Sequence, residues 1–180
     1  MTGGSELMAY PVTTIVQKAD ILVKKMGTRD PYQIIDNLGI KVVPCNFTKQ
    51  RGAYKVIMRN RFIFLNQNLS PIEKRIVLFH EIGHDTLHRQ EAATLGGFQE
   101  FQIFNMSESR MEYEANVFAA ELELDDDKFL EYCRQGYDIQ QIAYAMGSDI
   151  NLIALKADTL ILQGHCLHRQ DYKNDFLKYI

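Results

Sequence analysis

The chain has 180 residues, of which 46% are hydrophobic and 24% charged, and these proportions exclude a disordered or fibrous protein. This length suits one domain, or one domain with a small appendage, with a sizeable core. The formal net charge of -3 gives no overall attraction to nucleic acid or to an anionic membrane, so any such contact would have to be local.

The three cysteines, Cys45, Cys133 and Cys166, lie far apart and form no Cys-x-x-Cys pair. This arrangement disfavours a disulfide framework and a thiolate metal site, and it favours reduced thiols. The N-terminal residues lack the basic and apolar regions of a secretion signal, and no later run is long enough to span a bilayer. The sequence therefore predicts a cytoplasmic protein.

The first two predicted elements are helices. Apolar residues recur at helical spacing over 12–26 and stop at Gly27. Asp30 supplies an N-cap for a second, short helix, Pro31 suits its first position, and Gly39 ends it. Both helices are thus delimited by residues that favour helix ends.

Strands follow, and then a helix with a strong start signal. Short runs of β-branched and aromatic residues at 40–47, 53–58 and 61–66 predict two or three strands, with a hairpin between the last two. The sequence SPIE at 70–73 combines an N-cap serine, a proline and a glutamate in a capping box. It predicts a helix that begins at residue 71.

The remainder of the chain is predicted to be mainly helical. Residues 90–105 hold a Gly-Gly pair and aromatic residues without clean periodicity, which indicates a loop with a helical turn. Apolar residues then repeat at helical spacing from Ser107 to Leu122. Glycines separate three further predicted helices, at about 126–135, 139–146 and 149–163. Strands followed by helices predict an α+β fold with a helical C-terminal part.

The helix predicted from residue 71 carries the motif HEIGH at residues 80–84. With four-residue spacing, the side chains of His80 and His84 share one helix face, roughly 5–6 Å apart at Cβ, and can bind one metal ion. Glu81 lies about 100° around the helix from His80, so it can act on a water molecule without binding the metal. A metal ion makes water more acidic and a carboxylate can take its proton, so the motif predicts a zinc hydrolase.

A helix with two surface histidines is the alternative interpretation of this short motif. Apolar residues on both flanks argue against it, because they would bury the polar side chains, and buried polar groups without partners are costly. Gly83 costs roughly 1 kcal/mol relative to alanine inside a helix, so we expect another element or a substrate to approach closely there. His88 lies about 80° and roughly 12 Å from His80, so it is predicted to be a helix-end residue that does not bind the ion.

A catalytic zinc needs a third protein ligand and an open position for water. No cysteine or third histidine is well placed, so the expected source is a carboxylate on the helix that starts near residue 107. Glu114 is favoured because it is adjacent to the apolar stripe of that helix. Spacing alone leaves four candidates open: Glu108, Glu112, Glu114 and Glu121.

The sequences FHEIGHDTLH and EYEANVFAAELEL together resemble the ImmA/IrrE family of metallopeptidases, in which HE-x-GH is followed by E-A-N-x-F-A-A. The resemblance spans about residues 34–124 and includes the runs LGIKVV and FIFLN. It implies a gluzincin-like fold, in which a small, mostly antiparallel sheet packs on the HEIGH helix and a second helix delivers a glutamate. The sequence departs from the family at ELELDDDKF, where a leucine-rich stretch ending in proline is common, so the rim of the cleft is expected to differ.

The resemblance also implies a ligand set and a reaction. Zn²⁺ would be held by His80, His84 and Glu114, the glutamate directly before the A-N of the second motif, and Glu81 would be general base and then general acid in peptide hydrolysis. The implied substrate is a helix-turn-helix repressor of a phage or mobile element, so the protein would be an antirepressor protease. The strand at 61–66 is a candidate to pair with an extended substrate.

Two other functions are compatible with the sequence. One is a metal-containing regulator that binds a repressor or DNA without cutting it. The other is DNA binding through the helices predicted at 139–146 and 149–163, which resemble a helix-turn-helix. The second of these has Asp149 and Asp158 against one cation, Lys156, so strong phosphate binding is not expected.

The predicted boundary between the two parts of the chain lies near residue 124. Residues 1–124 are predicted to form the zinc metallopeptidase domain, and residues 125–180 a helical, helix-turn-helix-like region packed on it. A second histidine pair, His165 and His168, has no apolar frame or third ligand and is not predicted to bind metal. The proposed ligand types would also accept Mn²⁺, Co²⁺ or Ni²⁺ in vitro.

Overall fold

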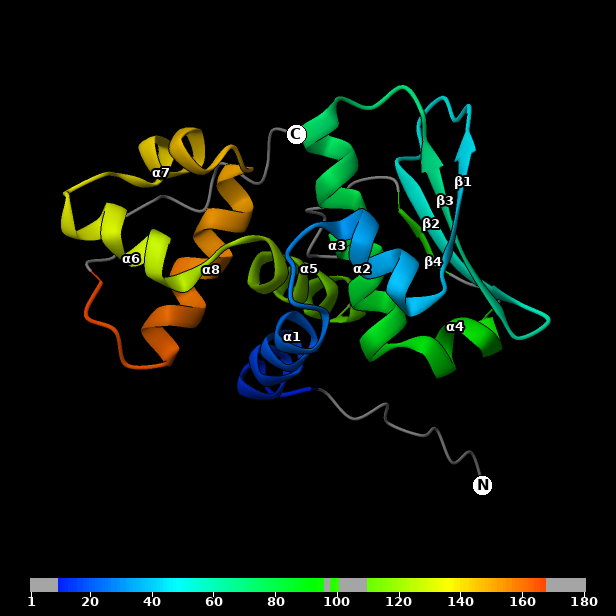
Figure 1. Ribbon diagram of the computed structural model, residues 1–180, viewed down its shortest axis with the longest axis horizontal. Helices are drawn as coiled ribbons and strands as arrows, with labels where there is room; N and C mark the ends of the chain where they lie inside the picture. The colour runs from blue at the N-terminus through cyan, green and yellow to red at the C-terminus, as the bar shows by residue number, and fades with distance from the viewer. Residues whose placement is uncertain (1–9, 96–97, 101–109, 168–180) are drawn as a thin grey trace.

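The computed structural model describes residues 10–95, 98–100 and 110–167, which form helices around one face of a small sheet (Figure 1). The α+β class predicted from the sequence is confirmed. The elements are, in chain order, α1 (Val12–Met26), α2 (Pro31–Leu38), β1 (Lys41–Cys45), β2 (Gly52–Ile57), β3 (Asn60–Asn66), α3 (Pro71–Leu87), α4 (Arg89–Leu95), β4 (Phe98–Glu100), α5 (Arg110–Glu123), α6 (Asp126–Arg134), α7 (Ile139–Met146) and α8 (Ile150–Leu162).

The predicted capping residues account for the helix ends. The Asp30 side chain accepts a hydrogen bond from the Tyr32 backbone N–H over 2.9 Å at the start of α2. At the start of α3, the Ser70 N–H donates to Glu73 over 2.9 Å and the Glu73 N–H donates to the Ser70 hydroxyl over 3.3 Å. The carboxyl of Glu73 has a lowered pKa because the Ser70 backbone N–H donates to it.

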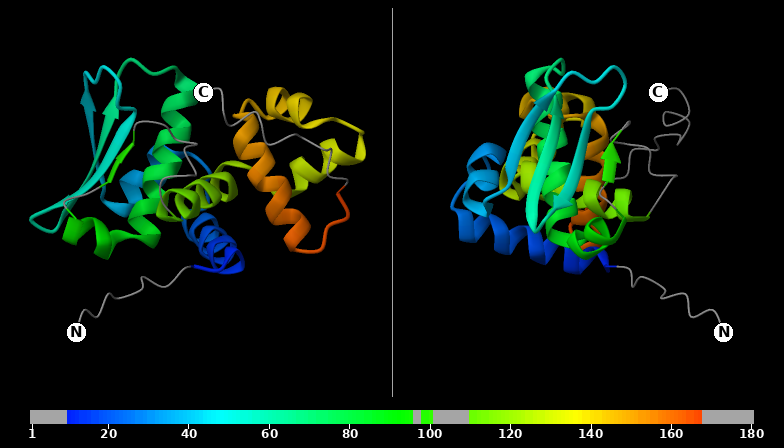
Figure 2. Two further views of the ribbon diagram at one scale, coloured as in Figure 1. Left: turned by 180° about the vertical axis from the view of Figure 1, so that it is seen from behind. Right: turned by 90° about the vertical axis from the view of Figure 1, so that its right-hand side faces the viewer.

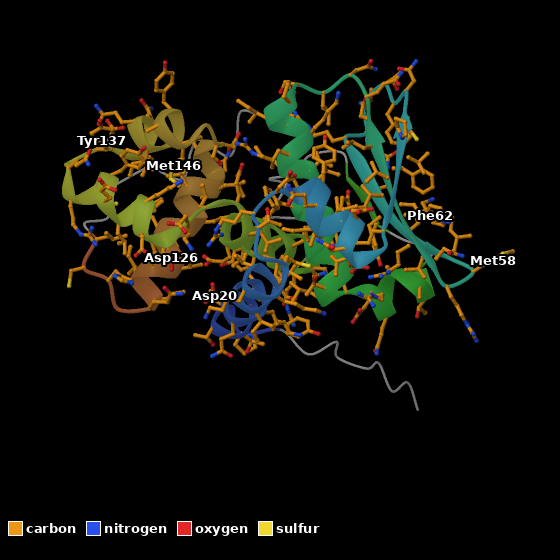
Figure 3. The ribbon with its side chains drawn as sticks, viewed as in Figure 1. Asp20, Met58, Phe62, Asp126, Tyr137 and Met146 are labelled. Carbon is orange, nitrogen blue, oxygen red and sulfur yellow. The ribbon has the colours of Figure 1, made fainter. Side chains whose placement is uncertain are left out.

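The sheet has the strand order β1-β3-β2-β4. β1 pairs parallel with β3, whereas β2 pairs antiparallel with both β3 and β4. The hairpin between β2 and β3 turns at Met58 and Arg59, which both have positive φ (Figure 3). Since β3 lies between two strands, both of its edges are already paired, and the prediction that this strand receives a substrate strand is wrong.

The segment predicted as a loop at 90–105 contains two elements in its described part. Arg89–Leu95 is the helix α4, and Phe98–Glu100 is the strand β4. β4 exists as a strand because it pairs with Tyr54, Ala53 and Gly52 of β2, a contact between distant segments that local periodicity does not reveal. Residues 101–105 lie outside the described residues.

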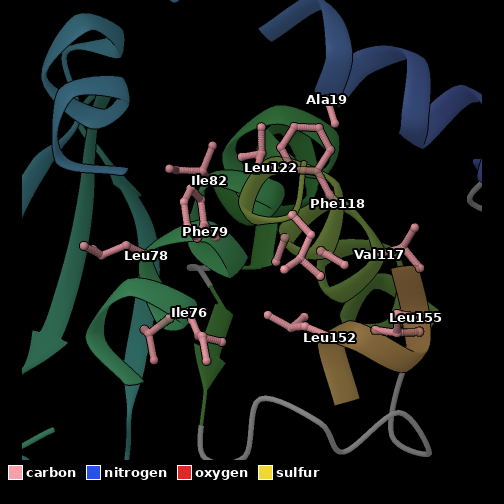
Figure 4. Close-up of a cluster of buried hydrophobic side chains, with 14 of the residues drawn as sticks. Ala19, Ile76, Leu78, Phe79, Ile82, Val117, Phe118, Leu122, Leu152 and Leu155 are labelled. Carbon is pink, nitrogen blue, oxygen red and sulfur yellow. The ribbon is translucent and has the colours of Figure 1, made fainter. Parts of the chain in front are cut away.

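α3 lies in the middle of the molecule, between the sheet and α5 (Figures 1 and 2). It contacts β2 and β3 on one side and α5 on the other, and α5 in turn contacts α1 and α8. One apolar core joins these elements, with Phe79 of α3, Phe118 of α5 and Leu152 of α8 among its fully buried side chains (Figure 4). The helices after residue 124 therefore share a core with α3, and the predicted division of the chain at residue 124 stays a prediction.

At Gly83 the backbone of α3 lies close to the backbone of α5. A Cβ atom on Gly83 would lie 3.0 Å from the carbonyl oxygen and 3.1 Å from the Cα of Ala115. Both atoms are backbone, so they cannot move aside without moving α5. This contact is the close approach of a second element that we expected from the helical glycine.

We expect Gly83→Ala to lower the free energy of unfolding by about 1–2 kcal/mol, because overpacking costs roughly 1–3 kcal/mol and alanine regains at most about 1 kcal/mol of helix propensity. Urea denaturation followed by circular dichroism measures the difference. Tyr144→Ala, at a side chain that is 92% exposed, is the control and should leave stability unchanged. A Gly83→Ala protein at least as stable as the parent would show that the helices adapt freely.

Among the residues that the structure describes, no helix has both the length and the apolar character needed to span a bilayer. His165, of the second histidine pair, is exposed, and His168 lies outside the described residues.

Candidate metal centre

Three side chains from two helices converge beside the contact between α3 and α5. His80 and His84 lie on α3, are 0% and 1% exposed, and bring their Nε2 atoms to 3.0 Å from each other. Glu112, in the first turn of α5, places Oε2 3.1 Å from His80 Nε2 and Oε1 3.4 Å from His84 Nε2. One potential ligand atom from each residue thus lies within 4.8 Å of the others.

These positions fit a small tetrahedral cation. Ligand atoms at about 2.0–2.2 Å from a tetrahedral Zn²⁺ are roughly 3.3–3.6 Å apart, close to the distances found here. His80 Nδ1 lies 2.9 Å from Asn116 Oδ1, and because an amide oxygen only accepts, the ring donates from Nδ1. Neutral His80 therefore carries its lone pair on Nε2, which faces Glu112 and His84, and the donor set of two imidazoles and one carboxylate suits zinc.

The ionisation states of the cluster also suit metal ligands. Burial lowers the pKa of His84 to about 4, although the nearby Glu112 carboxylate opposes this shift. Burial raises the pKa of the Glu112 carboxyl, but the adjacent His80 and His84 rings outweigh this effect and hold the pKa well below its usual range. A neutral imidazole and an ionised carboxylate are the forms that bind a metal ion.

Glu114, which the sequence favoured as third ligand, lies elsewhere. Its Oε2 accepts a hydrogen bond from His88 Nε2 over 2.9 Å, and its Oε1 accepts one from Arg110 Nε over 2.9 Å. The Tyr10 backbone N–H also donates to Oε1, over 3.1 Å. Since two residues correspond to about 200° of rotation on a helix, Glu112 and Glu114 cannot both face the two histidines.

Helical spacing in the sequence does not separate the two glutamates. Glu112 lies three residues before Ala115 of the apolar stripe of α5, whereas Glu114 lies three residues after Met111 and four before Phe118 of the same stripe. The placement of Glu112 beside the two histidines therefore depends on how α5 is rotated against α3 in the packed structure.

Glu81 is fully buried and its carboxylate lies against the first residue of β2. A Cβ atom on Gly52 would lie 2.7 Å from Glu81 Oε1 and 2.6 Å from Val77 Cγ1. Only glycine leaves space for the carboxylate there. The sequence-based interpretation did not single out Gly52, although a glycine at a strand end can mark a close approach of another group.

Asp85, the residue after His84, ties α3 to the sheet. Its buried carboxylate accepts hydrogen bonds from the Tyr54 hydroxyl over 2.6 Å, from Arg61 over 2.9 Å and from Arg89 over 2.7 Å. Burial and the neighbouring Asp85 carboxylate raise the pKa of the Tyr54 hydroxyl, so it remains a donor. These hydrogen bonds fix the rotation of α3 about its own axis relative to β2 and β3. In this orientation His80 and His84 point away from the Asp85 hydrogen bonds and toward α5.

Comparisons with known proteins show the family of the chain. The model of the peptidase family described as the IrrE N-terminal-like domain matches residues 35–156. The chain is 34% identical over 147 residues to Uncharacterized immunity region protein 2 of Bacillus phage phi105, a match that covers 81% of this chain and 90% of that protein. It is 28% identical over 139 residues to Metallopeptidase ImmA of Bacillus subtilis (strain 168), covering 74% and 78%. The chain therefore belongs to the IrrE N-terminal-like family of metallopeptidases.

Proposed function

We propose that this protein is a zinc-dependent metallo-endopeptidase that holds its ion with His80, His84 and Glu112 and cleaves a helix-turn-helix repressor of a phage or mobile element. The convergence of these three side chains, with a buried glutamate next to the first histidine, carries the proposal. A relative named for a phage immunity region supports a repressor as substrate. The name Metallopeptidase ImmA, borne by a second relative, supports peptide hydrolysis.

Bound zinc would supply Lewis acidity, which acidifies a water molecule and polarises the scissile carbonyl group. The Asn116 side-chain oxygen accepts a hydrogen bond from His80 Nδ1, which would leave the Nε2 lone pair available to bind the ion. Glu81 would take a proton from the attacking water at its carboxylate and then donate that proton to the leaving amine.

The position of Gly52 predicts that a methyl group there disturbs catalysis. We expect Gly52→Ala to lower the rate of peptide hydrolysis by up to about 100-fold, because displacement of a catalytic group by about 1 Å can have that effect. Initial rates at saturating zinc measure the loss. In the double variant Gly52→Ala/Val77→Ala the contact with Val77 is relieved and the contact with Glu81 remains, so the rate should stay low. Recovery of the rate in the double variant would assign the loss to Val77 instead.

The burial of the lysine in α8 argues against DNA binding through this helix. Lys156, its one cation, is 0% exposed, and its Nζ lies 2.6 Å from Glu121 Oε2 of α5. The same ammonium group also pairs with Asp126. A buried cation that already has two carboxylate partners cannot contact phosphate, so this observation favours a role in packing for α8.

The proposal is tested with the purified protein and any helix-turn-helix repressor encoded beside its gene, also purified. With zinc, new repressor termini should appear and be mapped by mass spectrometry; a chelator should prevent them and added zinc should restore them. An intact repressor that co-purifies with the zinc-loaded protein would support a regulator that binds without cutting. A salt-dependent gel shift of operator DNA by the protein alone would support DNA binding.

A further inference from the structure

A chain of hydrogen-bond contacts leads away from the Nδ1 side of the His84 ring, opposite the candidate metal centre. His84 Nδ1 lies 3.2 Å from His88 Nδ1, one helical turn further along α3. His88 Nε2 lies 2.9 Å from Glu114 Oε2, and Arg110 holds the other oxygen of this carboxylate. His88 and Glu114 are only 2% and 4% exposed, so these contacts are formed in a desolvated environment.

The chemistry of the donor and acceptor atoms fixes the direction of each hydrogen bond in this chain. A carboxylate only accepts, so His88 donates from Nε2 to Glu114. Neutral His88 then presents a lone pair at Nδ1, toward the Nδ1 atom of His84. The His84 ring can satisfy that contact by donating from Nδ1, and this tautomer leaves its lone pair on Nε2, the atom nearest Glu112 and His80.

We propose that His88 and Glu114 are positioning residues that fix the tautomer and ring orientation of the metal ligand His84. The inference rests on the proposed function, because it takes His84 to be a ligand through Nε2. Asn116 fills the equivalent position behind His80, so each ligand ring is held from its Nδ1 side. The three histidines of H-x3-H-x3-H thereby have distinct tasks, and Glu114 contributes through His88 instead of binding the ion.

The first test reads the tautomers directly in the full-length, zinc-loaded protein. Two-bond ¹H–¹⁵N correlation spectra of the imidazole rings distinguish a proton on Nδ1 from one on Nε2. We expect His84 to carry its proton on Nδ1 and His88 to carry its proton on Nε2. A proton on Nδ1 of His88, or on both of its nitrogens, would overturn the proposal.

A second test uses metal affinity and the visible spectrum of the Co²⁺-substituted protein. His88→Phe keeps a planar ring but removes the acceptor, and it should weaken Zn²⁺ binding by about 10–100-fold and alter the Co²⁺ absorption bands. His88→Gln keeps an acceptor oxygen and should recover much of the affinity. His165→Phe, at an exposed histidine, is the matched control and should bind Zn²⁺ as the parent does. Melting of the metal-free proteins reports loss of packing separately.

The outcomes separate this inference from the proposed function. If Glu112→Gln loses Zn²⁺ binding but His88→Phe keeps the parental affinity and Co²⁺ spectrum, the ligand set stands and the positioning role is refuted. If the parent protein itself binds no Zn²⁺, both are refuted. Weaker Zn²⁺ binding by His88→Phe, recovered in His88→Gln, supports both.

Discussion

Glu81→Gln should lower the rate of repressor cleavage by about 10²–10⁴-fold, the usual contribution of a general acid–base residue, and leave Zn²⁺ bound. The amide has nearly the shape of the carboxylate, so the space left by Gly52 remains filled. It cannot accept a proton from water at neutral pH, and that step is the one on which hydrolysis depends. Initial rates with the purified repressor and the zinc content of the same preparation measure the two effects.

A matched control for this variant is Glu121→Gln, a second buried glutamate, which pairs with Lys156 on α8. It changes charge in the same core without touching the candidate centre and is expected to affect stability more than the rate per folded molecule. Cleavage by Glu81→Gln at the parental rate, with zinc present, would refute the assignment of Glu81 as general base. If the parent protein and Glu81→Gln both bound the repressor and neither of them cleaved it, the result would support a regulator that binds without cutting.

The second large effect concerns the third ligand. Glu112→Gln should weaken Zn²⁺ binding by more than about 100-fold, because an amide replaces an anionic ligand, whereas changes in residues that support a ligand typically cost about 10–100-fold. Glu114→Gln should weaken Zn²⁺ binding only by about 10–100-fold, because Glu114 supports a ligand and does not bind the ion itself. Competition with a chromophoric chelator measures both dissociation constants. The reverse order, with Glu114→Gln the weaker binder, would restore the ligand set implied by the family resemblance.

Elements with local end signals could be predicted almost to the residue. The Ser70–Glu73 capping box and the αL glycine at residue 39 act within a few residues, so local sequence is sufficient to place the start of α3 and the end of α2. β4 could not be predicted because its strand character depends on pairing with β2, across many residues of chain. The parallel pairing of β1 with β3 likewise joins strands that are not consecutive in the chain, which local patterns do not reveal.

The candidate centre shows the same limit at the level of single side chains. Motif spacing brought His80, His84 and Glu81 into consideration, because all three lie on one helix whose geometry is known in advance. Choosing among the glutamates of α5 required the rotation of that helix about its own axis. This rotation is set by contacts such as Gly83 against Ala115, which only the packed structure reveals.

The proposed ligand set is divided between α3 and α5, and this division would link zinc binding to folding. Each helix supplies only part of the candidate site, so only the packed pair would bind the ion well, and the bound ion would in turn favour the packed pair. At a free zinc concentration of 100 times the dissociation constant, such linkage adds about 2.7 kcal/mol to the free energy of unfolding. Zinc limitation would therefore act on the protein twice, by removing the ion needed for catalysis and by increasing the fraction of unfolded chains open to degradation by other proteases.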